Sequence, residues 1–166
     1  MTELFTFSTA IDALAHCIES YFAKKANEIS RCYSVRVIRI LLEQLKKIDK
    51  EGFASITAAD REALYNASIY GGLAIHVTGT CMPHAVGYFL SESHGIPHGT
   101  ACAQFLPEFL AHNRNVDPEY CDLFYTEVGC TEEELTDLIL SVRPKYEITL
   151  DEAEIKELHT RWIDNA

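Results

Sequence analysis

The sequence predicts an all-α fold, and three observations support this prediction. Apolar residues recur at intervals of three and four positions through most of the 166 residues, which is the spacing of one helix face. No segment alternates convincingly between apolar and polar residues, as a half-buried strand would. No glycine-rich turn joins a strand to a helix, so the chain shows no dinucleotide-binding unit of its own. We expect a multi-helix bundle of about seven or eight helices, forming a single domain over residues 1–166.

Two long helices are expected at the start of the chain. The first has apolar residues at helical spacing from Ile11 to Phe22, and Ser8 or Thr9 is its expected N-cap. The second covers residues 29–49 and stops near Gly52, because glycine readily ends a helix.

A third long helix follows, with Thr57 and Asp60 at the spacing of a capping box. This helix contains Gly71 and Gly72 in its interior. Each interior glycine costs about 1 kcal/mol relative to alanine. Two adjacent glycines therefore indicate that another backbone approaches closely at this point.

Shorter helices are expected in the second half of the chain, where proline and glycine interrupt the apolar pattern. The segment GIPHG forms a turn between two of them. The expected helices cover residues 84–93, 100–113, 119–128 and 132–142, and Thr149 caps a last helix over residues 150–166.

The composition excludes several classes of protein. The formal net charge of -11 argues against a nucleic-acid partner or an anionic membrane, since phosphate contacts need clustered Lys and Arg. No apolar run is long enough to span a membrane, and the N-terminus lacks the basic start of a signal peptide. We therefore expect a soluble, cytoplasmic protein. The basic residues nearest to a patch are expected to form a solvated helix face: Arg31, Arg36, Arg39, Lys46 and Lys47.

Six cysteines occur without any CxxC pair. A chain of this size and apolar content does not need a disulfide framework. Several of the cysteines stand among small apolar residues, where cysteine behaves as a small buried hydrophobe. We expect reduced, structural cysteines.

Four residues are candidate metal ligands. Asp12 and His16 are spaced i, i+4, so their side chains lie on one face of the first helix. His84 and His98 each follow a proline and start a helix, from which two imidazoles could converge. One carboxylate and three imidazoles would suit Fe2+, Zn2+ or Mn2+. The same residues allow a simpler interpretation, namely an Asp–His hydrogen bond with two capping or core histidines.

The other histidines carry weaker signals. His94 lies in the loop sequence SESHGIP and is expected to be a bystander at the surface. His76 is close to two glycines but has no specified role, and His112 and His159 fall on expected helix surfaces. Tyr88 follows His84 by one turn, where it either leans into a pocket or packs in the core.

Two separated motifs resemble those of the iron-containing (group III) alcohol dehydrogenases. STAIDALAHCIESY resembles the segment that usually reads STGxDALxHAIExY in that family. PHAVGYFLSESHGIPHGTACAQFLPEFLAHN resembles the second hallmark, a histidine followed at a fixed interval by a loop ending in PHG and a helix. REALYNASIYGGLAIHVTGT, between them, is similar to the helix that leads into that histidine. The resemblance covers roughly residues 6–115.

This resemblance implies a fold and a site. In the family, a C-terminal all-helical domain supplies four metal ligands, which fall here on Asp12, His16, His84 and His98. The divalent metal, with Fe2+ expected and Zn2+ as the alternative, polarises an alcohol or aldehyde oxygen while NAD(P) carries the hydride. Many members carry a second histidine one turn after the third ligand. This chain has Tyr88 there, which puts a proton relay at that position in doubt.

The resemblance also implies a missing partner. In a complete enzyme, a nucleotide-binding domain binds NAD(P), and the motif that normally follows it begins here at residue 8. We expect an excised domain or a natural fragment that is inactive alone, with an exposed face that favours a homo-oligomer. Two other functions stay open. One is a catalytically silent helical interaction module, and the other is a metal-dependent hydrolase that activates water.

Overall fold

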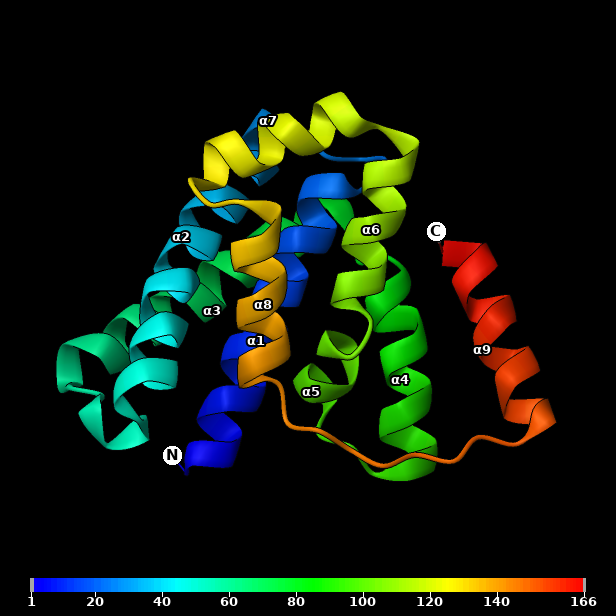
Figure 1. The fold of residues 1–166 in the computed structure, drawn as a ribbon. Helices are drawn as coiled ribbons and strands as arrows, with labels where there is room; N and C mark the ends of the chain where they lie inside the picture. The colour runs from blue at the N-terminus through cyan, green and yellow to red at the C-terminus, as the bar shows by residue number, and fades with distance from the viewer. Residues whose placement is uncertain (1, 166) are drawn as a thin grey trace.

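Helices make up the regular structure of the chain in the computed structural model, which describes residues 2–165 (Figure 1). No strand occurs within that range, so the all-α prediction is confirmed. Nine α-helices occur in the described residues instead of the seven or eight expected. In chain order the elements are α1 (Glu3–Phe22), α2 (Glu28–Glu51), the short 3-10 helix η1 (Phe53–Ser55), α3 (Ala58–Thr78), α4 (Met82–His94), α5 (His98–Ala103), α6 (Leu106–Val116), α7 (Pro118–Val128), α8 (Glu132–Val142) and α9 (Glu152–Asn165).

The additional helix arises because the single helix expected over residues 100–113 is divided into α5 and α6. Pro107 occupies the first turn of α6. Proline has no backbone N–H, so it cannot continue the hydrogen bonding of the preceding helix. Phe105, with φ -106° and ψ 0°, forms the junction. Because of this break, α5 is a separate helix that packs against α1.

Helix α1 lies at the centre of the molecule and packs against α2, α3 and α5 (Figure 1). Its side chains Ile11, Leu14, Ile18 and Tyr21 are fully buried in the main hydrophobic core. Burying one such side chain contributes about 1.5–3 kcal/mol. A helix covered on so many sides provides a fixed support for the polar residues that it carries.

The expected N-cap of α1 is wrong. The helix begins at Glu3, and Thr2 is its N-cap, with a side chain that accepts from the backbone N–H of Phe5. Ser8 lies buried inside the helix, and the hydroxyl of Thr9 donates to the Phe5 carbonyl at 2.8 Å. The apolar pattern marks where the helix is covered by its neighbours, whereas its first residues, Glu3 to Phe5, are exposed.

Helices α2 and α3 follow the sequence prediction closely. Gly52, with φ 81°, ends α2, and the capping box of Thr57 and Asp60 opens α3. Gly71 is a point of close approach, because an added Cβ would lie 3.4 Å from the carbonyl oxygen of Ala13 in α1. Gly72 has no neighbour within 4 Å of an added Cβ, so close approach explains only one glycine of the pair.

Helix α9 lies apart from α8 and packs against α4 (Figure 1). The expected cap at Thr149 is wrong, since Asp151 accepts from the backbone N–H of Glu154 at 2.9 Å. The Glu154 side chain in turn accepts from the N–H of Asp151, which completes a reciprocal cap. Aspartate caps as well as threonine, and it stands directly before the helix.

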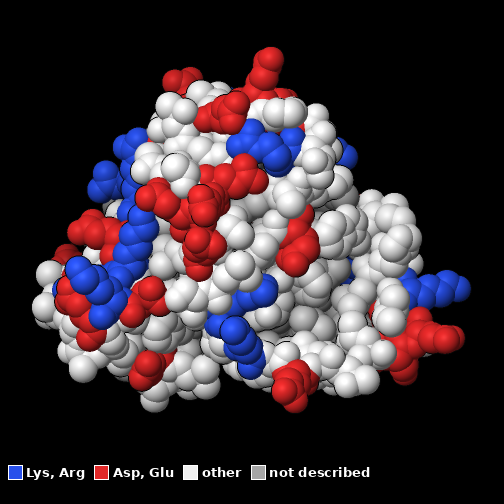
Figure 2. Space-filling view, viewed as in Figure 1, with Lys and Arg blue, Asp and Glu red and all other residues white. Residues whose placement is uncertain are grey.

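Acidic side chains outnumber basic ones, with 25 Asp and Glu against 14 Lys and Arg. On the face shown in Figure 2 they gather over α7 and α8, with Lys and Arg scattered between them. Within the described residues, no helix is long and apolar enough to cross a membrane. All six cysteines are free, as expected. Cys17, Cys102 and Cys121 are buried, whereas Cys32 is exposed.

Candidate metal centre

The four predicted ligands come together from three helices. Asp12 and His16 lie on α1, His84 lies in the first turn of α4, and His98 is the first residue of α5. The carboxylate of Asp12 is at the centre of this group. Its oxygens lie 3.7 Å from Nε2 of His16, 3.5 Å from Nε2 of His84 and 3.9 Å from Nε2 of His98.

Two glycines allow the helices to approach so closely. A Cβ on Gly99 would lie 2.0 Å from the carbonyl oxygen of Ser8 and 2.6 Å from Cβ of Asp12. A Cβ on Gly87 would lie 2.7 Å from Sγ of Cys102, which holds α5 close to α4. Only glycine fits at these two crossings, and they set the separation of the ligands on α1, α4 and α5.

The polar atoms at the centre fit a bound cation. Oδ1 of Asp12 and Nε2 of His84 are both buried, and neither has a hydrogen-bond partner among the described residues. Buried polar atoms are normally satisfied, so an orphaned pair facing one another at 3.5 Å needs a partner. A divalent cation between the carboxylate oxygen and the imidazole nitrogen would satisfy both atoms.

The electrostatics of the cluster favour positive charge. Burial acts to raise the pKa of Asp12, but the neighbouring imidazoles, that of His84 foremost, outweigh it and lower the pKa. Burial acts to lower the pKa of His84, yet the carboxylates of Asp12 and Glu19 outweigh it and raise the pKa to about 12. Burial lowers the pKa of His16 to about 4, so its imidazole is neutral near pH 7.

Glu19 and His84 form a contact that the sequence did not reveal. Oε1 of Glu19 is within hydrogen-bond distance of Nδ1 of His84, on the side of the ring away from Asp12. The Glu19 side chain is fully buried, and its Oε2 accepts from the backbone N–H of Cys81 at 2.5 Å. Glu19 lies one turn beyond the buried Ala15 on α1, so helical spacing places it on the buried face, and this spacing was the available signal.

Cys102 is a further residue that sequence reasoning missed. A ligand atom from each of Asp12, His84, His98 and Cys102 lies within 4.8 Å of the others, which makes these four a candidate metal-binding group. His16 is outside this group, although its ring stacks on that of His84 with centroids 4.7 Å apart. The i, i+4 spacing of His98 and Cys102 in HGTAC was the available signal.

Tyr88 and the remaining histidines occupy different surroundings. The ring of Tyr88 stacks on His98 with centroids 4.8 Å apart and is 48% exposed, so it borders the site and is not a core residue. His94 lies in the last turn of α4, not in a loop, where it contacts Glu154 at 3.0 Å. His76 and His159 are exposed.

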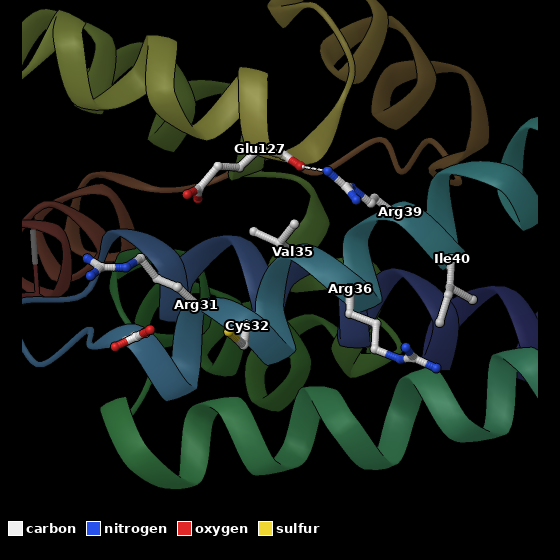
Figure 3. Close-up of a pocket in the computed structure, with 8 residues that line it drawn as sticks. Arg31, Cys32, Val35, Arg36, Arg39, Ile40 and Glu127 are labelled. Carbon is white, nitrogen blue, oxygen red and sulfur yellow. Dashed lines mark hydrogen bonds between the residues drawn. The ribbon is translucent and has the colours of Figure 1, made fainter.

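A separate groove between α2 and α7 collects three arginines (Figure 3). Arg36 and Arg39 are exposed, as expected of a solvated helix face, and Arg31 is partly exposed. Each of the three also makes a specific contact. Arg31 donates to the Tyr120 hydroxyl at 3.2 Å, Arg36 lies over the ring of Tyr70, and Arg39 donates to the Glu127 carbonyl. They join helices, and this groove contains none of the predicted ligands.

An all-α domain that brings a carboxylate and imidazoles from three helices close together contains a candidate metal-binding group. Residues 6–159 match the sequence profile described as Fe-containing alcohol dehydrogenase family, C-terminal. The chain belongs to this family, which normally pairs this domain with an NAD-binding domain.

Solved structures and curated relatives agree with this assignment. The fold is similar to that of an iron-containing alcohol dehydrogenase, with a TM-score of 0.81 at 27% identity over 99% of this chain and 43% of the other. An iron-containing alcohol dehydrogenase from Thermotoga maritima gives a TM-score of 0.79 at 28% identity, covering 98% and 43%. The chain is 31% identical over 114 residues to a 1,3-propanediol dehydrogenase of Citrobacter freundii, covering 69% of this chain and 29% of the relative. The chain thus spans less than a third of that relative's length.

Proposed function

We propose that the chain is the metal-binding domain of an NAD(P)-dependent alcohol dehydrogenase, with Asp12, His16, His84 and His98 as ligands of one Fe2+ ion. The observation that carries this proposal is the pair of buried, unpartnered atoms Oδ1 of Asp12 and Nε2 of His84. An enclosed carboxylate with neighbouring imidazoles is a donor set that Fe2+ accepts, and Zn2+ is the alternative ion.

The bound ion would act as a Lewis acid on an alcohol or aldehyde oxygen, while the nicotinamide of a complete enzyme carries the hydride. The chain's own residues prepare this site. Burial keeps His16 neutral and thus able to bind a cation. His98 is 37% exposed, so the site opens to solvent beside this residue. Tyr88 stacks on the exposed His98 and would form one wall of the entrance.

Membership of the family supports the proposed substrate and partner domain. Relatives with similar sequences carry names such as 1,3-propanediol dehydrogenase and probable alcohol dehydrogenase. We propose a small primary alcohol or polyol, or the corresponding aldehyde, as substrate. Hydride transfer would require a nucleotide-binding domain, which we place with this chain in the cytoplasm.

An exposed apolar stripe along α3 supports a partner surface. Tyr65, Ile69, Leu73 and Val77 follow one another at intervals of four residues and are 65%, 44%, 43% and 39% exposed. Monomeric proteins rarely leave a contiguous apolar stripe in water. The stripe is consistent with a covering domain or with a homo-oligomer of this chain.

Metal analysis tests the proposal. The purified chain is loaded anaerobically with Fe2+, passed over a desalting column and analysed for bound iron. We expect one ion per chain and its loss in His98→Ala, whereas His159→Ala, which changes an exposed histidine on α9, should retain it. Absence of bound iron in the wild-type chain, and of zinc after the same treatment, would refute the proposal.

A further inference from the structure

We propose that Glu19 is a positioning residue of the metal centre, which holds the ring of His84 so that Nε2 faces the ion. This inference rests on the proposed function, because it assigns a role to a residue that supports one of its ligands. Glu19 itself is too far around the ring to contact the ion, since it meets His84 at Nδ1 and not at Nε2.

The contacts of Glu19 are those of an anchored carboxylate. The side chain comes from α1, is fully buried and accepts from the backbone N–H of Cys81 at 2.5 Å. The backbone N–H of His84 also points to Oε2, at 3.5 Å. Its other oxygen meets Nδ1 of His84. The backbone N–H groups of Cys81 and His84 and the imidazole of His84 therefore all face the carboxylate of Glu19.

Glu19 also supplies the cap that α4 lacks. Cys81 is the N-cap residue, and its side chain makes no capping hydrogen bond. The first N–H groups of a helix have no partner within the helix, and a negative charge is favourable there. The carboxylate from α1 takes this place, so one residue joins α1 to the start of α4 and orients the first imidazole of that helix.

The direction of the His84 hydrogen bond follows from the chemistry of the partner. A carboxylate that accepts from backbone N–H groups has no proton to give, so Nδ1 of His84 must be the donor. In the neutral ring, the form that binds a metal, the lone pair is then on Nε2, which is buried, unpartnered and 3.5 Å from Oδ1 of Asp12. A carboxylate that accepts from one ring nitrogen of a histidine fixes the tautomer and the orientation of the ring, so that the other nitrogen can bind a metal.

A purely structural role for Glu19 makes a different prediction. If the carboxylate only stabilised the fold, its replacement would lower the melting temperature and leave the affinity of the folded chain for metal unchanged. A positioning role requires the affinity to fall in a chain that is still folded. Loss of a side chain that hydrogen-bonds a metal ligand typically lowers the metal affinity by about 10- to 100-fold.

The test compares Glu19→Gln with a matched control. Glu127→Gln removes a carboxylate that accepts from the Tyr21 hydroxyl at 2.6 Å, on a different face of α1 from the metal centre. The dissociation constant for Zn2+ is measured by competition with a chelator, and folding of the metal-free chains is measured by circular dichroism. We expect a rise of about 10- to 100-fold in the constant for Glu19→Gln and less than about twofold for Glu127→Gln, within ordinary error for a distant site.

A second readout is independent of affinity. In the wild-type chain labelled with 15N-histidine, we expect an exchange-protected Nδ1–H resonance of His84 in the metal-free form, which persists after Zn2+ is added. Wild-type affinity in folded Glu19→Gln, or an Nδ1 of His84 that carries no protected proton, would overturn the inference. If the wild-type chain binds no metal, the proposed function fails. The Nδ1–H resonance then still shows whether Glu19 accepts a hydrogen bond from His84. If Glu19→Gln does not fold, that resonance decides alone.

Discussion

Gly99 is the position where a single methyl group should disrupt the metal centre most. In Gly99→Ala the new Cβ would lie 2.0 Å from the carbonyl oxygen of Ser8, 2.6 Å from Cβ of Asp12 and 3.0 Å from its backbone nitrogen. Two of these atoms are backbone of α1, which cannot rotate away. Helix α5 must therefore shift by roughly 1.4 Å to restore the 3.4 Å of ordinary contact.

The expected effects follow from that shift. Overpacking a core contact costs about 1–3 kcal/mol, which corresponds to a melting temperature about 2–12 °C lower for a chain of this size. Metal sites tolerate deviations of only about 0.2 Å in ligand distance, so displacement of His98 from Asp12 should abolish tight binding. Thermal unfolding of the metal-free chain and Zn2+ titration of the folded chain measure the two effects separately.

Gly72→Ala is the matched control for this substitution. It lies inside α3, where an added Cβ meets nothing within 4 Å, so it should stabilise the helix by about 0.5–1 kcal/mol and leave metal binding unchanged. A Gly99→Ala chain with wild-type stability and wild-type affinity would refute the packing argument. A similar loss of affinity in both variants would show that the effect does not come from the crossing of α1 and α5.

Three further predictions concern other parts of the molecule. The hydrogen bond from Lys47 and those from Thr57 hold the pKa of Asp60 below its usual range, so its stabilising effect is present above pH 3.8 and is lost as the pH falls through the lowered pKa. Asp60→Asn should therefore lower the melting temperature at pH 7, and the difference from wild type should close in acid; a gap that stayed constant would contradict this sign. With Co2+ bound, the near-ultraviolet spectrum should lack a thiolate-to-metal band and should not change in Cys102→Ser, since we assign the fourth ligand to His16. A thiolate band that disappears in Cys102→Ser would show that Cys102, and not His16, is the fourth ligand. The isolated chain given NAD+ and a primary alcohol should form negligible NADH, and steady turnover would contradict the need for a nucleotide-binding domain.

The sequence predicted the parts of the fold and site that depend on local spacing. Helical periodicity placed Asp12 and His16 on one face, and the capping box of Thr57 located the start of α3. Pro107 was also a readable signal for the break between α5 and α6. The start of α1 was harder, because periodic burial marks where a helix is covered and does not mark its exposed first turn.

The remaining features depend on contacts between distant segments. Helical spacing from Ala15 places Glu19 on the buried face of α1. Its partner His84 is 65 residues away, so no local pattern identifies the contact. Cys102 stands among small apolar residues and is buried, but its Sγ also lies 3.7 Å from Nε2 of His98. Convergence of the four ligands was implied by the family resemblance, and only the packing of α1, α4 and α5 brings them together.

Anomalous diffraction at the iron edge would test the central claim most directly. A crystal of the Fe2+-loaded chain should show one strong anomalous peak, with Asp12, His16, His84 and His98 each placing an oxygen or nitrogen atom about 2.0–2.2 Å from it. A peak bound by Sγ of Cys102 without His16 would correct the ligand set. Iron-loaded crystals with no peak among Asp12, His84 and His98 would contradict the account.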